Sequence, residues 1–444
     1  MPDFNILDYG ALGNGTTNDA AAIQKTIDAC GESGGGRVLV PSARVFKCGP
    51  IKLASRVELH LEAGSQLAAI PDIRLYPEFG LPSLGGEGQK WIHADSADFV
   101  SITGPGIIDG CGVQWMSGEE KYHFNMHAGR PFVLNMENCR HVTLKDFTIR
   151  DAPFWTVHML GCDDVLAQNL RILNNLKIGN NDGINPNRCR NVRIIGCHIE
   201  AADDCICLKS EEASDEARYG ACENIIVQGC TLVSTSCAIK VGTGTFGAIR
   251  NLIVDSCIIS RSNRGIGLVM RDGGCISDML FSNIIVETRL FHPYWWGAGE
   301  PIYVTALRRK EGLPAGTIRN IRFSNIACRS ENGVYIAAED PRDINNLTFS
   351  NVSVELTKHT RHPGSFFDRR PCAIPGRHEH PTSGFFISNA SKISLRNCAV
   401  RWGANPPEYY RHALEAENAP GLTMEGLEGI SAFPDKYEPV LVHK

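Results

Sequence analysis

The sequence predicts an all-β fold, a parallel β-helix built from stacked coils. Two observations predict it: segments of alternating apolar residues recur at intervals of 26 to 46 residues, and 44 glycines and 23 prolines indicate frequent turns. A unit of two or three such strands cannot bury its apolar face alone, so neighbouring units must stack. A β-propeller is the alternative, but Asn-Gly or Asp-Gly hairpins do not occur at the regular spacing that its blades require.

The repeated segment is seen first as DVLAQNLRI (164–172). Seven later segments share its pattern: NVRIIGCHI (191–199), NIIVQGCTL (224–232), NLIVDSCII (251–259), DMLFSNIIV (278–286), NIRFSNIAC (320–328), NLTFSNVSV (346–354) and KISLRNCAV (392–400). One column of Asn or Cys runs through them: Asn169, Cys197, Cys230, Cys257, Asn283, Asn325, Asn351 and Asn397. We expect these side chains to occupy the same corner site and to stack on one another.

A second column sets the register of another strand in each coil. The segments DGINP (182–186), DCICL (204–208), CAIKV (237–241) and RGIGL (264–268) superimpose. Their isoleucines are expected to stack inward: Ile184, Ile206, Ile239 and Ile266. Strand alternation then predicts an outward polar strip, with rungs about 4.8 Å apart, made of Asn185, Cys207, Lys240 and Gly267.

The chain is expected to form one domain over residues 1–444, with a cap and the first coils in 1–70. Within TTNDAAAIQKTIDACGESGGG (16–36), Asn18 or Asp19 is a candidate N-cap and a glycine run ends the segment, which predicts a short amphipathic capping helix. Loops at 110–130, 287–317 and 357–384 are long; the last two interrupt the repeat and are rich in Arg, His, Pro and aromatic residues. Such insertions commonly line one face of a solenoid.

Composition excludes several classes of partner. The net charge is −5 with no basic block, so we expect no nucleic-acid partner. Neither a signal peptide nor an apolar run long enough to span a membrane is visible, which favours a cytoplasmic protein without membrane contact. Seventeen cysteines fit buried thiols better than a disulfide framework. No metal-binding or nucleotide-binding motif is found, so we expect no metal and no cofactor.

Three carboxylates meet in this register. Asp182 and Asp204 fall on adjacent rungs, and Asp203 is next to Asp204. Crowded carboxylates raise the pKa of at least one of them, which provides a protonated acid beside an ionised base, as cleavage of a glycosidic bond requires. The alternative is that each aspartate only caps its own turn.

The order of motifs resembles the polygalacturonase family, glycoside hydrolase family 28, whose fold is a right-handed, pectin-lyase-like parallel β-helix. The resemblance covers about residues 4–290 and rests on the N-terminal segment, on IIDGCGVQW and APFWTVHMLGCDDV, and on NNDGINP and ADDCICLKS. It implies hydrolysis with inversion of a glycosidic bond in a pectic saccharide. Carried over by motif, it implies Asp203 as the general acid, with Asp182 and Asp204 activating the attacking water.

Two motifs of the family are broken. Cys237 stands where the histidine of Gly-His-Gly is expected, and Arg-Ile-Lys is replaced by Val269-Met270-Arg271-Asp272. The residues that bind the carboxylate of the sugar in the family are therefore changed. Lys240 and Arg264 are candidate replacements, with an ordinary solvated surface cation as the alternative for each. Arg271 is a third candidate, with a local ion pair to Asp272 as its alternative, and Lys209 is a candidate partner of substrate or aspartate.

Aromatic and acidic residues add further candidates for substrate binding. Trp155 and His158 precede Asp182 by one coil, where the family places cleft residues, although Trp155 fits a packed corner nearly as well. Trp296 lies in a glycine-flanked loop, and Glu300 at its end can bond sugar hydroxyls or replace a lost catalytic group. A core plug beneath the loop is the alternative.

These features predict an exo-acting inverting glycosidase that removes a terminal sugar from pectic oligosaccharides or plant glycosides, since long loops would close the cleft. Galacturonate is the expected sugar, and a neutral sugar such as rhamnose, apiose or xylose is the alternative. A β-eliminating lyase and a non-catalytic carbohydrate-binding β-helix are the other hypotheses. An unsaturated product absorbing in the ultraviolet would identify the lyase.

Overall fold

We describe the protein from a computed structural model, in which residues 2–76, 88–126, 129–212 and 216–443 are described. Residue contacts divide the chain into two compact units. The first comprises Met1–Asp203 and Ala217–Tyr219, and the second comprises Asp204–Glu216 and Gly220–Lys444. The prediction of one domain over the whole chain stays a prediction.

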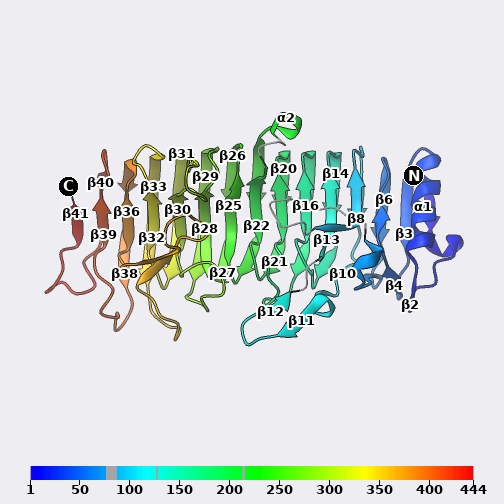
Figure 1. The fold of residues 1–444 in the computed structure, drawn as a ribbon, viewed down its shortest axis with the longest axis horizontal. Helices are drawn as coiled ribbons and strands as arrows, with labels where there is room; N and C mark the ends of the chain where they lie inside the picture. Colours follow the sequence, from blue (N-terminus) through cyan, green and yellow to red (C-terminus); the bar gives the residue numbers. More distant parts are fainter. Residues whose placement is uncertain (1, 77–87, 127–128, 213–215, 444) are drawn as a thin grey trace. The chain divides into compact units, whose positions relative to one another are not determined.

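In the first unit, parallel strands form three ladders, and successive coils add one strand to each ladder (Figure 1). The first ladder is β1 (Asp3–Asn5), β3 (Gly36–Val40), β6 (Val57–Leu61), β9 (Ser101–Thr103), β14 (Arg140–Lys145), β17 (Asp163–Gln168) and β20 (Arg190–Ile195). The second is β2 (Asn14–Asn18), β4 (Val45–Cys48), β7 (Gln66–Ala69), β10 (Ile107–Asp109), β15 (Thr148–Arg150), β18 (Arg171–Leu173) and β21 (His198–Ala201). The third is β5 (Ile51–Lys52), β8 (Gln89–Asp95), β13 (Pro131–Glu137), β16 (Val157–Leu160) and β19 (Ile184–Asn187).

The second unit has the same plan, except that two strands of a coil fuse in its middle. Its third ladder is β22 (Ile206–Ser210), β25 (Cys237–Thr245), β28 (Arg264–Met270), β30 (Ile302–Ala306), β32 (Val334–Ala338), β36 (Phe385–Ser388), β39 (Leu414–Glu417) and β41 (Val440–His443). The other ladders begin with β23 (Cys222–Gln228), β24 (Thr231–Ser234), β26 (Ala248–Asp255) and β27 (Ile258–Ser262). They continue through the long strands β29 (Cys275–Thr288), β31 (Thr317–Ser330) and β33 (Ile344–Leu356), and end with β37 (Ser391–Arg396), β38 (Ala399–Trp402) and β40 (Thr423–Glu425).

The predicted fold class, an all-β right-handed parallel β-helix with a capping helix, is confirmed. Ile206, Ile239 and Ile266 pair in register on neighbouring strands and are fully buried, as predicted for an inward stack. In the other ladders, the rings of Phe281, Phe323 and Phe349 stack from rung to rung with centroids 5.0 and 4.8 Å apart. Identical neighbours pack well because each coil repeats the backbone of the one before it.

The predicted Asn and Cys column is wrong by one residue. Asn169 aligns with Gly196, since the Asn169 N–H bonds the Ile195 carbonyl, and both have positive φ. The left-handed corner is occupied by Asn169, Gly196, Gly229, Ser256, Asn283, Asn325, Asn351 and Asn397, and the Asn and Gly residues among them tolerate this conformation best. Cys197, Cys230 and Cys257 occupy the next position, which is buried. The asparagines do stack, as Asn351 Nδ2 donates to Asn325 Oδ1 at 3.0 Å.

The predicted capping helix is α1 (Ala20–Glu32), which packs on β1, β3, β5 and β6 through Ile23, Thr26, Ile27 and Cys30. Asp19 is its N-cap, but the Asp19 carboxylate accepts the N–H groups of Leu12 and Gly13 instead of those of the first turn. Asn18 Oδ1 accepts the Ala20 N–H at 3.1 Å and thereby supplies a cap. The helix ends at Glu32 with Ser33 as its C-cap, and Gly34 and Gly35, with φ of +98° and +111°, turn the chain away after the cap.

In the described part of the chain, the other helical turns are short: η1 (Ile6–Tyr9), η2 (Ile73–Leu75), η4 (Gly112–Trp115) and α2 (Glu216–Tyr219). Within the predicted loop 110–130, of which residues 127–128 lie outside the described residues, β11 (Met116–Glu119) and β12 (Phe124–Met126) form an antiparallel hairpin. In 357–384, β34 (Phe366–Asp368) and β35 (Arg377–Glu379) form another. The loop predicted at 287–317 is two loops, because β30 lies inside it. Among the described residues, no helix is both long and apolar enough to cross a membrane.

Candidate active site

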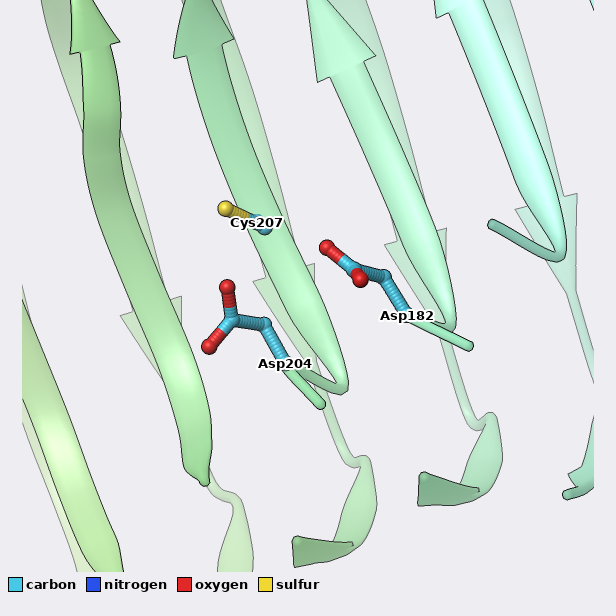
Figure 2. A group of neighbouring side chains, drawn as sticks. All are labelled: Asp182, Asp204 and Cys207. Atoms are coloured by element: carbon cyan, nitrogen blue, oxygen red, sulfur yellow. The ribbon is translucent and has the colours of Figure 1, made fainter. Parts of the chain in front are cut away.

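Two of the predicted catalytic aspartates lie in short turns, each immediately before a strand of the third ladder of its unit. Asp182 precedes β19 and Asp204 precedes β22, with Cys207 inside β22 (Figure 2). Asp182 is 2% exposed and accepts a hydrogen bond from Asn185 Nδ2 to its Oδ2 at 3.2 Å. Asp203, the predicted general acid, is half-buried.

Asn181 fixes the turns that carry Asp182 and Asp203. Its Nδ2 donates to the Asn175 carbonyl at 2.7 Å, inside the turn that leads to Asp182. Its Oδ1 accepts the N–H groups of Ala202 and Asp203 at 2.8 and 3.4 Å, in the next coil. This fully buried amide therefore fixes the backbone beside both Asp182 and Asp203. In the sequence, Asn181 is visible only as one letter of the NNDGINP motif.

His158 and Trp155 lie on the outer side of the coil before Asp182. His158 pairs in register with Asn185 and is fully buried, with Asn135 Nδ2 at 2.9 Å from its Nδ1. Trp155 is 2% exposed and its ring is parallel to that of Phe154, with centroids 5.7 Å apart. The structure thus favours the packed-corner alternative for Trp155 over a wall for sugar stacking.

Asp204 is held by a buried cation. Lys240 Nζ lies 2.7 Å from Asp204 Oδ2, and the two side chains are 7% and 1% exposed. The ammonium also lies beneath the half-buried ring of Trp296, 5.6 Å from its centroid. The predicted polar surface strip is therefore wrong for Asn185, Cys207 and Lys240, which are all buried. At Lys240, the ring of Trp296 from the loop 289–301 covers the ammonium.

Arg264 and Glu300 form a second buried pair. Arg264 Nε and Nη2 each lie 3.3 Å from an oxygen of Glu300, and the side chains are 3% and 0% exposed. The guanidinium also lies 3.6 Å above the ring of Tyr303. Burial alone would lower the pKa of Arg264, but the charge of Glu300 outweighs it and the net shift is upward. Glu300 is thus a buried, ion-paired residue. This arrangement is close to the alternative in which the loop residues form a core plug.

Asp368 is a central residue that sequence reasoning missed. Its Oδ2 accepts the Gly297 N–H at 2.8 Å, its carbonyl accepts Arg264 Nη2 at 2.9 Å, and Arg370 pairs with its carboxylate at 2.8 Å. Arg370 Nη2 in turn donates to the carbonyls of Pro293 and Trp295. Hairpin β34–β35 therefore clamps the loop that carries Trp296. No local pattern marks Asp368, because its partners are 71 and 104 residues away.

Lys209 and Arg271 are both buried, and the predicted role of Lys209 as a partner of substrate or aspartate stays a prediction. Lys209 is 4% exposed and lies 3.9 Å from Glu211. Arg271 is fully buried and donates to the carbonyls of Met270, Arg369 and Pro371 and to the Thr305 hydroxyl. The suggested Arg271–Asp272 ion pair is wrong, because Arg309 pairs with Asp272 at 2.6 Å and turns it away from its neighbour in sequence.

Cys237, at the position of the family's histidine, is buried and its thiol donates to the Ile239 carbonyl at 3.2 Å. Burial raises the pKa of this thiol, so it stays protonated at neutral pH. It cannot take over proton transfer from an imidazole.

The model for glycosyl hydrolases family 28 matches residues 30–365 of this chain. The chain belongs to glycosyl hydrolase family 28. The resemblance inferred from the motif order is thereby confirmed.

Similar proteins within family 28 carry both endo and exo names. A probable polygalacturonase of Vitis vinifera is 29% identical over 53% of this chain and 50% of its own length. An endo-polygalacturonase of Pectobacterium carotovorum subsp. carotovorum is 24% identical over 75% of this chain and 83% of its own length. The first of these alignments spans about half the length of the relative.

A solved structure supports the fold. The hyperthermoactive exopolygalacturonase of Thermotoga maritima superimposes with a TM-score of 0.72 at 20% identity, covering 90% of this chain and 92% of its own. At this identity the likeness shows the β-helix fold and nothing about the sugar.

Proposed function

We propose that this family 28 protein hydrolyses a glycosidic bond of a pectic saccharide with inversion, using Asp182, Asp203 and Asp204. The observation that carries the proposal is the set of three aspartates, placed in the turns before β19 and β22 and supported by buried polar partners. Buried carboxylates in ordered turns are poised for proton transfer, whereas a pure binding module gains nothing from them.

In the proposed reaction, Asp203 protonates the glycosidic oxygen while Asp182 and Asp204 take a proton from water on the opposite face of the sugar. The acid and the base must stand about 6.5–9.5 Å apart to admit that water. Asp203 suits the acid because it is the most exposed of the three and can reach the leaving group. Asn185 and Lys240 suit the base pair because they fix its carboxylates.

We propose further that the enzyme acts on the end of its substrate. The loop 289–301 stands beside Lys240 and Asp204 and is clamped by hairpin β34–β35, which supports a cleft closed at one end. Galacturonate is the terminal sugar that the family favours. A neutral sugar is the second candidate, and the carboxylate partners of Lys240 and Arg264 favour it.

Asp203→Asn tests the catalytic assignment. We expect loss of turnover by a factor of about 10³ or more with substrate binding retained, because the amide cannot donate the proton that the leaving group needs. Asp164→Asn is the control, since Asp164 is a surface aspartate paired with Arg193 on a neighbouring strand. Unchanged turnover in Asp203→Asn would overturn the assignment. Release of internal fragments as efficiently as terminal sugar would overturn exo action.

We also propose that the protein works in a reducing compartment, consistent with the cytoplasm. All seventeen cysteines are free thiols, and fifteen of them are buried. Fractionation of the native cells, followed by activity assay, tests this: enrichment in the extracellular fraction would contradict it.

A further inference from the structure

Two of the three cations that the sequence offers as binders of a sugar carboxylate, Lys240 and Arg264, are already paired with carboxylates of the protein. Lys240 bonds the Asp204 carboxylate at 2.7 Å in a buried position. Arg264 contacts both oxygens of Glu300, which accepts a further hydrogen bond from the Ala298 N–H at 2.7 Å. Each pair brings one positive and one negative charge, so together they contribute no net charge.

Arg271 is not available to bind a ligand. Its Nε, Nη1 and Nη2 all donate to main-chain carbonyls, and the residue is fully buried. Its guanidinium therefore holds the 369–371 segment in place and has no face toward a ligand. Gly267, which pairs in register with Lys240, has no side chain to add a charge at the neighbouring rung.

The half-buried ring of Trp296 is the apolar element beside these pairs. The loop is held by Asn263 Nδ2, which donates to the Trp296 carbonyl at 3.2 Å, and by Asp368 through the Gly297 N–H. A fixed aromatic face packs against the C–H face of a sugar ring and makes no demand for charge.

From this balance we infer that the terminal sugar removed by the enzyme is neutral, a hexose, deoxyhexose or pentose without a carboxylate. The inference deepens the proposed function and rests on it. A uronate would bring an uncompensated negative charge beside Asp204, and desolvating an unpaired charge is strongly unfavourable. A neutral sugar needs only hydrogen bonds, which the Asp204 carboxylate and the Lys240 ammonium can provide.

Matched glycosides test the inference. Nitrophenyl galactosides and galacturonides, and glucosides and glucuronides, differ only by a hydroxymethyl or a carboxylate at C6; xylosides lack C6, and rhamnosides extend the neutral set. Both anomers of each are assayed. We expect kcat/KM for a neutral member to exceed that of every uronide by about 100-fold or more. Equal or faster release of a uronate would overturn the inference.

Glu300→Gln tests whether the charge of Glu300 causes the expected preference for a neutral sugar. The substitution keeps the shape and one hydrogen-bond acceptor but leaves the charge of Arg264 uncompensated, so the ratio of uronide to neutral kcat/KM is expected to rise about tenfold or more. Glu339→Gln is the matched control: Glu339 pairs with Arg308 at the opposite end of the strands of this ladder, and the ratio should not change. An unchanged ratio in folded Glu300→Gln would contradict the charge argument.

Binding separates failure of the inference from failure of the proposed function. Calorimetry with galactose, xylose, rhamnose and galacturonate on the wild-type protein requires no turnover. Tighter binding of a neutral sugar without hydrolysis of any glycoside would overturn the proposed function and support only the preference of the site for a neutral sugar. Tighter binding of galacturonate would overturn the inference whatever the activity, and binding of none would overturn both.

Discussion

Single side chains at the site are fixed by buried ionic partners. Lys240 and Asp204 are both removed from water, so each charge depends on the other for its compensation. The alternation of β25 places Lys240 on the correct side of the strand, and only the structure shows which carboxylate it meets. A buried pair of this kind holds one orientation of the carboxylate, which is what a base needs.

Lys240→Met tests that dependence. The substitution leaves Asp204 charged, 1% exposed and without its ammonium, so we expect a loss of about 3–5 kcal/mol in the free energy of unfolding. The double variant Lys240→Met with Asp204→Asn removes both charges and should be more stable than the single variant. Urea unfolding of the wild type, both single variants and the double variant measures this. A double variant less stable than Lys240→Met would contradict the pairing.

At the scale of elements, hairpin β34–β35 and the loop 289–301 act as one assembly. Asp368 holds it from one side through Gly297 and Arg264, and Arg370 holds it from the other through two carbonyls. Burial alone would raise the pKa of Asp368, but the hydrogen bonds of Arg370 and the charges of Arg264 and Arg370 lower it. A lowered pKa means that this stabilisation is present at neutral pH and is lost as pH falls through the folded value.

Asp368→Asn should loosen the assembly. We expect a loss of about 1–3 kcal/mol in stability at neutral pH that shrinks in acid, because the wild type then loses the same charge. Acrylamide quenching of tryptophan fluorescence and the release of internal fragments should both increase. Asp340→Asn is the control, since Asp340 and Arg342 repeat the same Asp-x-Arg pair at the surface, where water screens the charges and little stability depends on them. Equal losses in the two variants would contradict the clamp.

Across the whole molecule, the features that repeat from coil to coil could be predicted from the sequence, and the features that do not repeat could not. The coils, α1 and the register of Ile206, Ile239 and Ile266 follow from apolar spacing, because each coil must bury the same face. The Asn and Cys column is misassigned from sequence because Asn169 and Cys197 both lie near corners. The left-handed backbone conformation, which favours Asn and Gly, distinguishes the two positions. The role of Asp368 and the partner of Glu300 could not be predicted from the sequence, because both depend on contacts made by insertions. Insertions do not follow the repeat.

The positions of the thiols make it possible to measure which parts of the molecule open first. Cys275 and Cys372 are partly accessible, and the other fifteen cysteines are buried. An alkylating reagent should therefore modify these two first under native conditions, since a thiol must reach solvent to react. Every further adduct, located by peptide mass spectrometry over time, then reports a local opening of the structure, from Cys30 on the buried face of α1 to Cys398 near the last strands. Simultaneous modification of all fifteen would show instead that the coils open together.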